Sequence, residues 1–305
     1  MIARRRVLTA LAVTGLVFAA CFIAIFGVLV LAERGQWALG GNRVALVEVE
    51  GLIVDAQQVV RQLEEHLEDP SIRAVVVRVE SPGGVVGPSQ EIHDAIARVR
   101  EKDKPVVVSM GAIAASGGYY LAVAADHIVA NPGTLTGSIG VLIQLAEIEG
   151  LLKKVGVHFE VIKAGRHKDV GNFSRPMTPE ERAILQGLLD DMYDQFVTAV
   201  AKGRRLDRAT VLELADGRVY SGRRAKELGL VDSLGGLEDA VRTAGRLAKI
   251  PGKPQLVRPR RAFHLTDLAD WLGSRTPLGV LFPGRGALTP WPILSATKLP
   301  LYLME

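Results

Sequence analysis

The chain has 305 residues, of which 48% are apolar, and its 37 Lys and Arg against 33 Asp and Glu give a net charge of +4. Its basic residues are scattered and form no stripe interleaved with aromatic residues, which argues against nucleic-acid binding. The single cysteine, Cys21, excludes an intrachain disulfide and a cysteine-based metal site. The six histidines are isolated and show no HExxH-like spacing, so no metal is expected.

The N-terminal segment determines the predicted compartment. Residues 7–32 carry no charge, and this run is long enough to cross a membrane, which takes roughly 20 residues as a helix. It is also longer than the roughly 7–15 apolar residues of a cleaved signal peptide. Because Arg4, Arg5 and Arg6 precede the run, residues 1–6 are expected in the cytoplasm. We therefore predict a single-pass signal anchor in the cell membrane over 7–32, a linker over 33–43 and an extracytoplasmic body.

A lipoprotein is the alternative to this anchor. Phe18-Ala19-Ala20-Cys21 faintly resembles a lipoprotein cleavage site. The apolar run continues well beyond Cys21, where a mature lipoprotein normally becomes polar, so the anchor is the favoured interpretation.

Beyond the linker, apolar patterns of period 2 and period 3.6 alternate along the chain. Strands are predicted at 44–51, 74–80, 105–109, 127–130 and 159–163, and helices at 55–68, 90–100 and 116–125. Repeated strand-then-helix units indicate an α/β fold with a mostly parallel sheet flanked by helices.

The longest predicted helix covers 178–205. Thr178-Pro179-Glu180-Glu181 supplies an N-cap, a proline at the first position and a capping-box glutamate. Its expected buried face consists of Ile184, Leu188, Met192 and Phe196. Shorter helices are predicted near 208–215, 222–228 and 237–248. Proline and glycine become frequent after 250, so we predict one domain over 44–250 and a docking arm over 251–305.

Three glycine-rich turns follow predicted strands, at 81–84, 110–118 and 131–140. The second places Ser116 at a helix N-terminus, where free N–H groups and the helix dipole can stabilise an oxyanion. None of the turns matches a P-loop or GxGxxG pattern, so a nucleotide cofactor has no support.

A nucleophilic serine needs a base. His127 or His167 could serve, although nothing specifies a Ser-His-Asp order and the GxSxG pattern is absent because position 114 is Ala. A lysine can serve instead where desolvation keeps its amine neutral. Lys168 lies in a glycine-flanked segment after a predicted strand and is the third candidate.

Four motifs occur in a fixed order: SPGG at 81–84, AASGGYYLAVAAD at 114–126, TGSIGV at 136–141 and GRHKDVGNFSRPMT at 165–178. Together they resemble the signal peptide peptidase A family of serine peptidases over roughly 44–250. The resemblance implies a Clp-protease/crotonase-type ββα fold and no metal or organic cofactor. Residues 172–176 read Asn-Phe-Ser-Arg-Pro where many relatives have Gly-Ser-Pro directly, so the family's substrate contacts in that loop are not carried over to this chain.

The same resemblance assigns roles to five residues. Ser116 would be the nucleophile, Lys168 the general base and Ser138 the side chain that orients the lysine. The N–H groups of Gly83 and Gly117 would hold the oxyanion. The chain resembles the short, single-copy members, in which serine and lysine come from neighbouring subunits of a ring, so a homo-oligomer is expected.

These inferences predict a membrane-anchored serine endopeptidase that degrades cleaved signal peptides and other short, unstructured apolar peptides. Two alternative functions are also compatible with the sequence. One is a non-enzymatic membrane scaffold. The other is a crotonase-type acyl-CoA enzyme of the same fold, which the predicted export signal disfavours.

Overall fold

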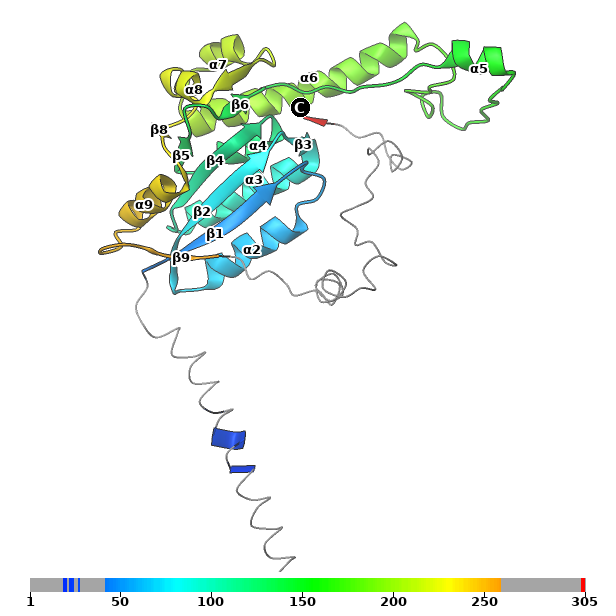
Figure 1. The fold of residues 1–305 in the computed structure, drawn as a ribbon. Helices are drawn as coiled ribbons and strands as arrows, with labels where there is room; N and C mark the ends of the chain where they lie inside the picture. Colours follow the sequence, from blue (N-terminus) through cyan, green and yellow to red (C-terminus); the bar gives the residue numbers. More distant parts are fainter. Residues whose placement is uncertain (1–18, 21, 25–26, 28–41, 259–302, 305) are drawn as a thin grey trace, which may run out of the picture.

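A computed structural model describes residues 19–20, 22–24, 27, 42–258 and 303–304 (Figure 1). Most of the predicted anchor at 7–32, including Cys21, lies outside these residues, as do 1–6 and most of the linker at 33–43. The few described positions within the anchor are helical. Within the part of the chain that the structure describes, no helix is both long and apolar enough to cross a membrane.

An eight-stranded, mostly parallel sheet forms the centre of the body. The strands are β1 (Arg43–Glu50), β2 (Ile72–Ser81), β4 (Val106–Ala115), β5 (His127–Ala130), β6 (Leu135–Gly137), β7 (Val219–Ser221), β8 (Ser233–Leu234) and β9 (Gln255–Val257). Their order is β7-β6-β4-β2-β1-β9, and β5 pairs with both β4 and β8. Among the described strands of this sheet, β6 and β7 pair antiparallel and the other pairs are parallel. The predicted mixed α/β fold is therefore confirmed.

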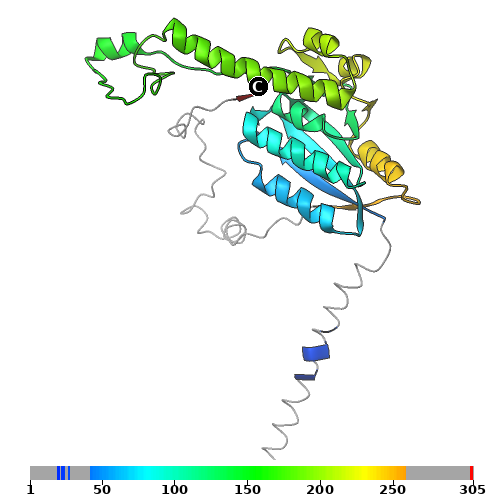
Figure 2. The ribbon, with the colours of Figure 1, turned by 180° about the vertical axis from the view of Figure 1, so that it is seen from behind.

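Helices cover both faces of this sheet (Figures 1 and 2). The helices α2 (Gln57–Glu68), α3 (Val86–Glu101) and α4 (Gly117–Ala122) lie on one face, and α9 (Leu237–Leu247) lies on the other. Successive strand side chains point to opposite faces, so Val75 and Val77 pack with the first group while Val76 packs with α9. Continuous valine runs such as 75–77 are consequently buried on both sides.

The long helix α6 (Pro179–Arg204) begins as predicted, because Thr178 and Glu181 form the capping box. Its C-terminal half packs on the body through Phe196, Val197 and Val200, all fully buried. Its N-terminal half extends beyond the sheet together with α5 (Glu149–Val155), as both views show. The prediction that Ile184 is buried is wrong for this chain alone, since its side chain is 43% exposed.

The predicted strand at 159–163 is also wrong. This segment has no strand partner in the described chain, and its residues are exposed. Phe159 packs its ring on Phe173 at 5.2 Å instead, because an apolar run forms a strand only where a sheet edge is within reach.

Several short elements complete the body. Helices α7 (Arg208–Leu214) and α8 (Gly222–Glu227) follow α6. Strand β3 (Gly84–Val85) pairs antiparallel with β10 (Leu303–Met304) near the C-terminus. Strand β9 pairs with β1, so the sheet recruits residues beyond position 250. The domain boundaries at 44, 250 and 251 stay predictions.

Candidate active site

Ser116 occupies a sharp turn between the end of β4 and the start of α4. Its backbone has φ 51° and ψ −119°, a conformation that costs a non-glycine residue of order 1–3 kcal/mol and persists only where the surroundings enforce it. Two hydrogen bonds enforce it here. The Ser116 N–H donates to the Gly137 carbonyl at 2.8 Å, and the Ser116 carbonyl accepts from the Tyr120 N–H at 2.8 Å. A strained strand-to-helix turn of this kind presents a nucleophile in other hydrolase folds.

The Ser116 hydroxyl has no hydrogen-bond partner in the part of the chain that the structure describes. It is fully buried, and among the described residues its Oγ is the only buried side-chain nitrogen or oxygen atom without a hydrogen bond. Leaving such a group unpaired costs about 1–3 kcal/mol, so native structures keep few of them. A strained backbone and an unpaired buried hydroxyl at the same residue indicate a functional site.

The turn at 81–84 packs directly against the start of α4. A Cβ atom added to Gly117 would lie 2.5 Å from Ser89 Oγ and 3.2 Å from the Gly84 nitrogen, so only glycine fits. Gly83 has φ 116°, which also favours glycine. Its N–H donates to Ser81 Oγ at 3.1 Å, so in this state the predicted oxyanion donor is engaged within its own turn.

Ser138 lies beside Ser116 because their strands are paired. The register of β4 and β6 ends at Ala115 and Gly137, so the two serines leave adjacent strands side by side. Ser138 also has φ 51°, and its N–H donates to the Arg218 carbonyl at 2.9 Å. The structure therefore brings Ser116, Gly117, Gly83 and Ser138 together.

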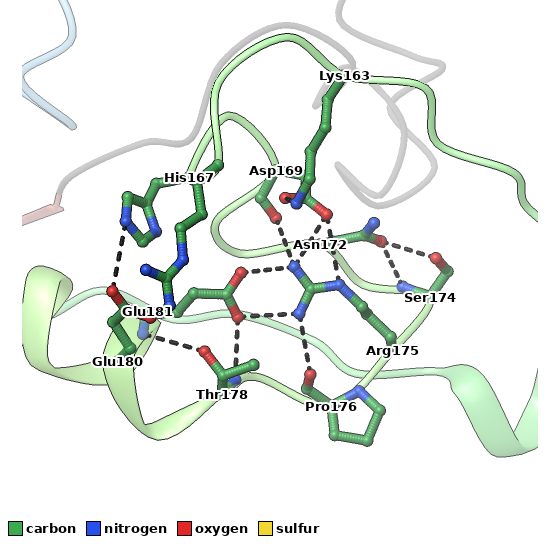
Figure 3. A network of polar contacts seen from close by, with 11 residues as sticks. Lys163, His167, Asp169, Asn172, Ser174, Arg175, Pro176, Thr178, Glu180 and Glu181 are labelled. Atoms are coloured by element: carbon green, nitrogen blue, oxygen red, sulfur yellow. Dashed lines mark hydrogen bonds and ion pairs between the residues drawn. The ribbon is translucent and has the colours of Figure 1, made fainter.

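Lys168 is exposed and lies in a different part of the molecule. We use the term lysine loop for residues 163–178, which include it. Figure 3 shows the polar network that ties this loop to the first turn of α6. Arg175 is its centre, donating from Nη2 to Asp169 Oδ2 at 2.9 Å and from Nη1 to Glu181 Oε2 at 2.9 Å. Lys163 also pairs with Asp169.

The charges in this network stabilise the ionised carboxylates. Hydrogen bonds from Lys163 and Arg175 hold the pKa of Asp169 well below its usual range. Arg175 and the Thr178 N–H lower the pKa of Glu181 to about 2. Ion pairs and hydrogen bonds therefore attach the lysine loop to the start of α6.

The length of α6 separates Lys168 from Ser116 within one chain. Tyr120, whose N–H bonds Ser116, packs its ring on Phe196 at 5.1 Å between centroids. The lysine loop is tied to Glu181 at the opposite part of α6. At about 1.5 Å per residue, the stretch from Glu181 to Phe196 covers roughly 22 Å. A lysine side chain is far shorter than this separation.

Neither candidate histidine forms a hydrogen bond with the Ser116 hydroxyl. The His127 Nε2 atom lies 2.9 Å from Ser233 Oγ, and burial lowers the pKa of His127. The His167 Nε2 atom lies 3.5 Å from Glu180 at the start of α6. The described chain therefore offers no Ser-His pair at this position.

Two structurally important residues were not singled out from the sequence. Arg175 organises the lysine loop, and it falls in the stretch 172–176 that departs from the family pattern. Glu80 binds the backbone of β4 shortly before Ser116. Its place directly before the SPGG motif was the only available signal.

Comparison with known proteins shows the family. The model of peptidase family S49 matches residues 98–251, and the Clp protease model matches 44–134. The chain is 48% identical to slr0021 of Synechocystis sp., a protein provisionally named as a protease, over 70% of this chain and 78% of that protein. The chain belongs to peptidase family S49.

This S49 chain is a serine peptidase. It is 37% identical to Protease 4 of Salmonella typhi over 69% of the chain, and 36% identical to the chloroplastic serine protease SPPA of Arabidopsis thaliana over 73%. It spans only 35% and 34% of those two longer proteins. Ser116, Ser138 and Lys168 lie within the S49 match, whereas Gly83 precedes it and lies within the Clp match.

Proposed function

We propose that Ser116 is the nucleophile of this S49 peptidase and that Lys168 of a neighbouring copy is its general base. The observation that carries the proposal is the buried, unpartnered Ser116 Oγ on a strained turn at the N-terminus of α4. An unpaired hydroxyl is free to accept a hydrogen-bonding partner that arrives from outside the chain.

The chemistry follows from the groups around this hydroxyl. The neutral lysine amine takes the Ser116 proton as Oγ attacks the substrate carbonyl. Because Gly117 is the first residue of α4, its N–H has no partner within the helix and can donate to the oxyanion. The Gly83 N–H would join it after leaving Ser81 Oγ, and Ser138 would orient the ammonium. Lysine then protonates the leaving amine, and water hydrolyses the acyl-enzyme.

Exposed apolar side chains support assembly with further copies. Leu151, Val155, Phe159 and Ile162 are all more than half exposed on the segment that extends from the body with α6. Exposed apolar side chains that gather on one segment are typical of interaction surfaces. A ring would bury them and carry each lysine loop to the Ser116 site of the next copy.

The edge of β3 supports binding of an extended peptide. β3 directly follows the turn at 81–84, and it already pairs antiparallel with the two-residue strand β10. A substrate could take the place of β10 on this edge as an added strand. Leu52 and Val54 are exposed on either side of Ile53, which bridges to Gly84. These side chains favour apolar substrates, for which cleaved signal peptides are our candidates.

Membrane anchoring through 7–32 is the remaining part of the proposal. The uncharged run and the preceding Arg4, Arg5 and Arg6 support a single span with the peptidase body outside the cytoplasm. External protease added to spheroplasts should digest the body. Protection of the body until the membrane is permeabilised would contradict this topology.

Hydrolysis of a quenched-fluorescence apolar peptide tests the catalytic assignment. Ser116→Ala or Lys168→Ala in the full chain should lower the rate by about 10⁴-fold or more, as removal of a nucleophile or its base generally does. The matched controls are Ser109→Ala, which changes a fully buried serine of β4, and Lys154→Ala, which changes a lysine of α5; both should remain active. Near-normal rates in either test variant would refute the mechanism.

A further inference from the structure

The ladder between β2 and β4 is interrupted shortly before Ser116. Their parallel register runs regularly to Val79 opposite Met110 and resumes at Ser81 opposite Ala114. Glu80 alone therefore faces the segment 111–113, so β4 contains a bulge. Bulges near active sites redirect the side chains that follow them.

The Glu80 carboxylate replaces the missing ladder acceptors. Its Oε1 and Oε2 accept from the Ala112 N–H at 2.9 and 3.0 Å, and Oε1 also accepts from the Ile113 N–H at 3.1 Å. Arg78, two residues earlier on the same strand, donates to the Met110 carbonyl at 3.2 Å. The side chains of β2 thus satisfy backbone groups that the regular ladder leaves unpaired.

Gly111 provides the space for this carboxylate. A Cβ atom added to Gly111 would overlap Glu80 Oε2, while the backbone of Gly111 is not in the left-handed region and would accept an alanine. The glycine is therefore required by the position of the Glu80 side chain and not by backbone conformation.

The bulge is the point at which β4 changes partner. Before it, Val107 to Met110 pair with β5, and after it Ile113 to Ala115 pair with β6. Ser116 follows at once. Glu80 also directly precedes Ser81 and the turn that carries Gly83. A single side chain thus joins the two segments that hold the nucleophile and the predicted oxyanion donors.

We propose that Glu80 is a positioning residue, which fixes the β4 bulge and thereby aims Ser116 and Gly117 at the substrate carbonyl. The inference rests on the proposed role of Ser116. Glu80 itself touches no reacting atom, so its effect belongs to the rate of chemistry and not to substrate binding.

The test measures labelling of Ser116 by a fluorophosphonate, and kcat and KM for an apolar peptide, in the assembled full chain. Glu80→Ala should lower kcat and the labelling rate about 10- to 100-fold with KM changed less than about threefold, since a displacement near 1 Å can cost that much. Glu80→Gln keeps one acceptor oxygen and should recover most of the rate. Ser109→Ala, which removes a neighbouring contact of Arg78, is the control and should match wild type.

A second variant keeps the test decisive if Glu80→Ala folds poorly. Gly111→Ala displaces the carboxylate without removing it and should produce the same loss. In the double variant Glu80→Ala/Gly111→Ala, the Glu80 carboxylate is gone and the alanine at 111 has room, so the loss of kcat should not exceed that of Glu80→Ala alone. Full activity of folded Glu80→Ala, a rise in KM alone, or multiplicative losses in the double variant would overturn the inference. An unlabelled wild-type Ser116 would instead refute the proposed function.

Discussion

Mixing two inactive variants should restore activity if the dyad is shared between copies. Ser116→Ala lacks the nucleophile but keeps Lys168, and Lys168→Ala has the opposite defect. In one chain the two residues are held apart by the stretch of α6 that covers roughly 22 Å. Each active site must then combine Ser116 of one copy with Lys168 of the next, and mixed rings contain some sites with both groups intact.

The size of the recovery follows from random assembly. In an equal mixture each site has about one chance in two of an intact serine and one in two of an intact lysine, so about one quarter of wild-type activity should return for a heterologous ring interface. The variants are co-expressed with different affinity tags, and doubly purified rings are assayed for peptide hydrolysis.

A second mixture distinguishes dyads shared between copies from dyads held within one chain, because the two arrangements leave different fractions of active sites intact. Wild type mixed equally with the double variant Ser116→Ala/Lys168→Ala should keep about one quarter of the sites if dyads are shared, and about one half if each chain holds its own. The shared dyad would be refuted if the first mixture forms mixed rings without recovering activity and the second mixture keeps one half of the wild-type activity.

The remaining predictions concern stability and the lysine loop. Gly203→Ala should destabilise the body by about 1–3 kcal/mol in thermal or urea unfolding, because the added Cβ atom would overlap the Val123 carbonyl where α6 crosses the end of α4. An unchanged unfolding midpoint would contradict this packing. Arg175→Ala should make residues 163–178 accessible to proteolysis and lower turnover by at least about tenfold, without changing the melting temperature of the body. Arg175→Lys should restore turnover only in part, because a lysine cannot bridge both Asp169 and Glu181 as a planar guanidinium does. Because the pKa of Glu181 in the folded protein is lowered to about 2, the ion pair between Arg175 and Glu181 should be complete above about pH 4.5 and be lost as the pH falls towards 2. Amide hydrogen exchange in residues 163–178, corrected for intrinsic rates, should rise over this range. Exchange that is independent of pH would contradict this prediction.

Local patterns predicted the central layers well. Apolar runs such as 75–77 identified strands, and the capping box at Thr178 fixed the start of α6. The glycine-rich stretch 110–118 placed Ser116 at a strand-to-helix junction, where the structure has it, although β4 continues to Ala115 and the turn is shorter than expected. These features depend on residues close in sequence, which is why the sequence alone revealed them.

Features that depend on distant contacts were missed. Ile184 has the spacing of a buried helix face, but the body does not extend beneath that half of α6. The segment 159–163 has strand composition without a sheet edge to join. The bulge opposite Glu80 arises from the register between strands about thirty residues apart, which a single strand pattern cannot encode.

The role of Ser116 is tested most directly by identifying the residue that an active-site probe modifies. Full-length protein extracted from membranes is treated with a fluorophosphonate and mapped by peptide mass spectrometry. We predict one modified residue, Ser116, with labelling abolished by Ser116→Ala and strongly slowed by Lys168→Ala. Modification of a different serine, or unchanged labelling of Ser116→Ala, would contradict the account.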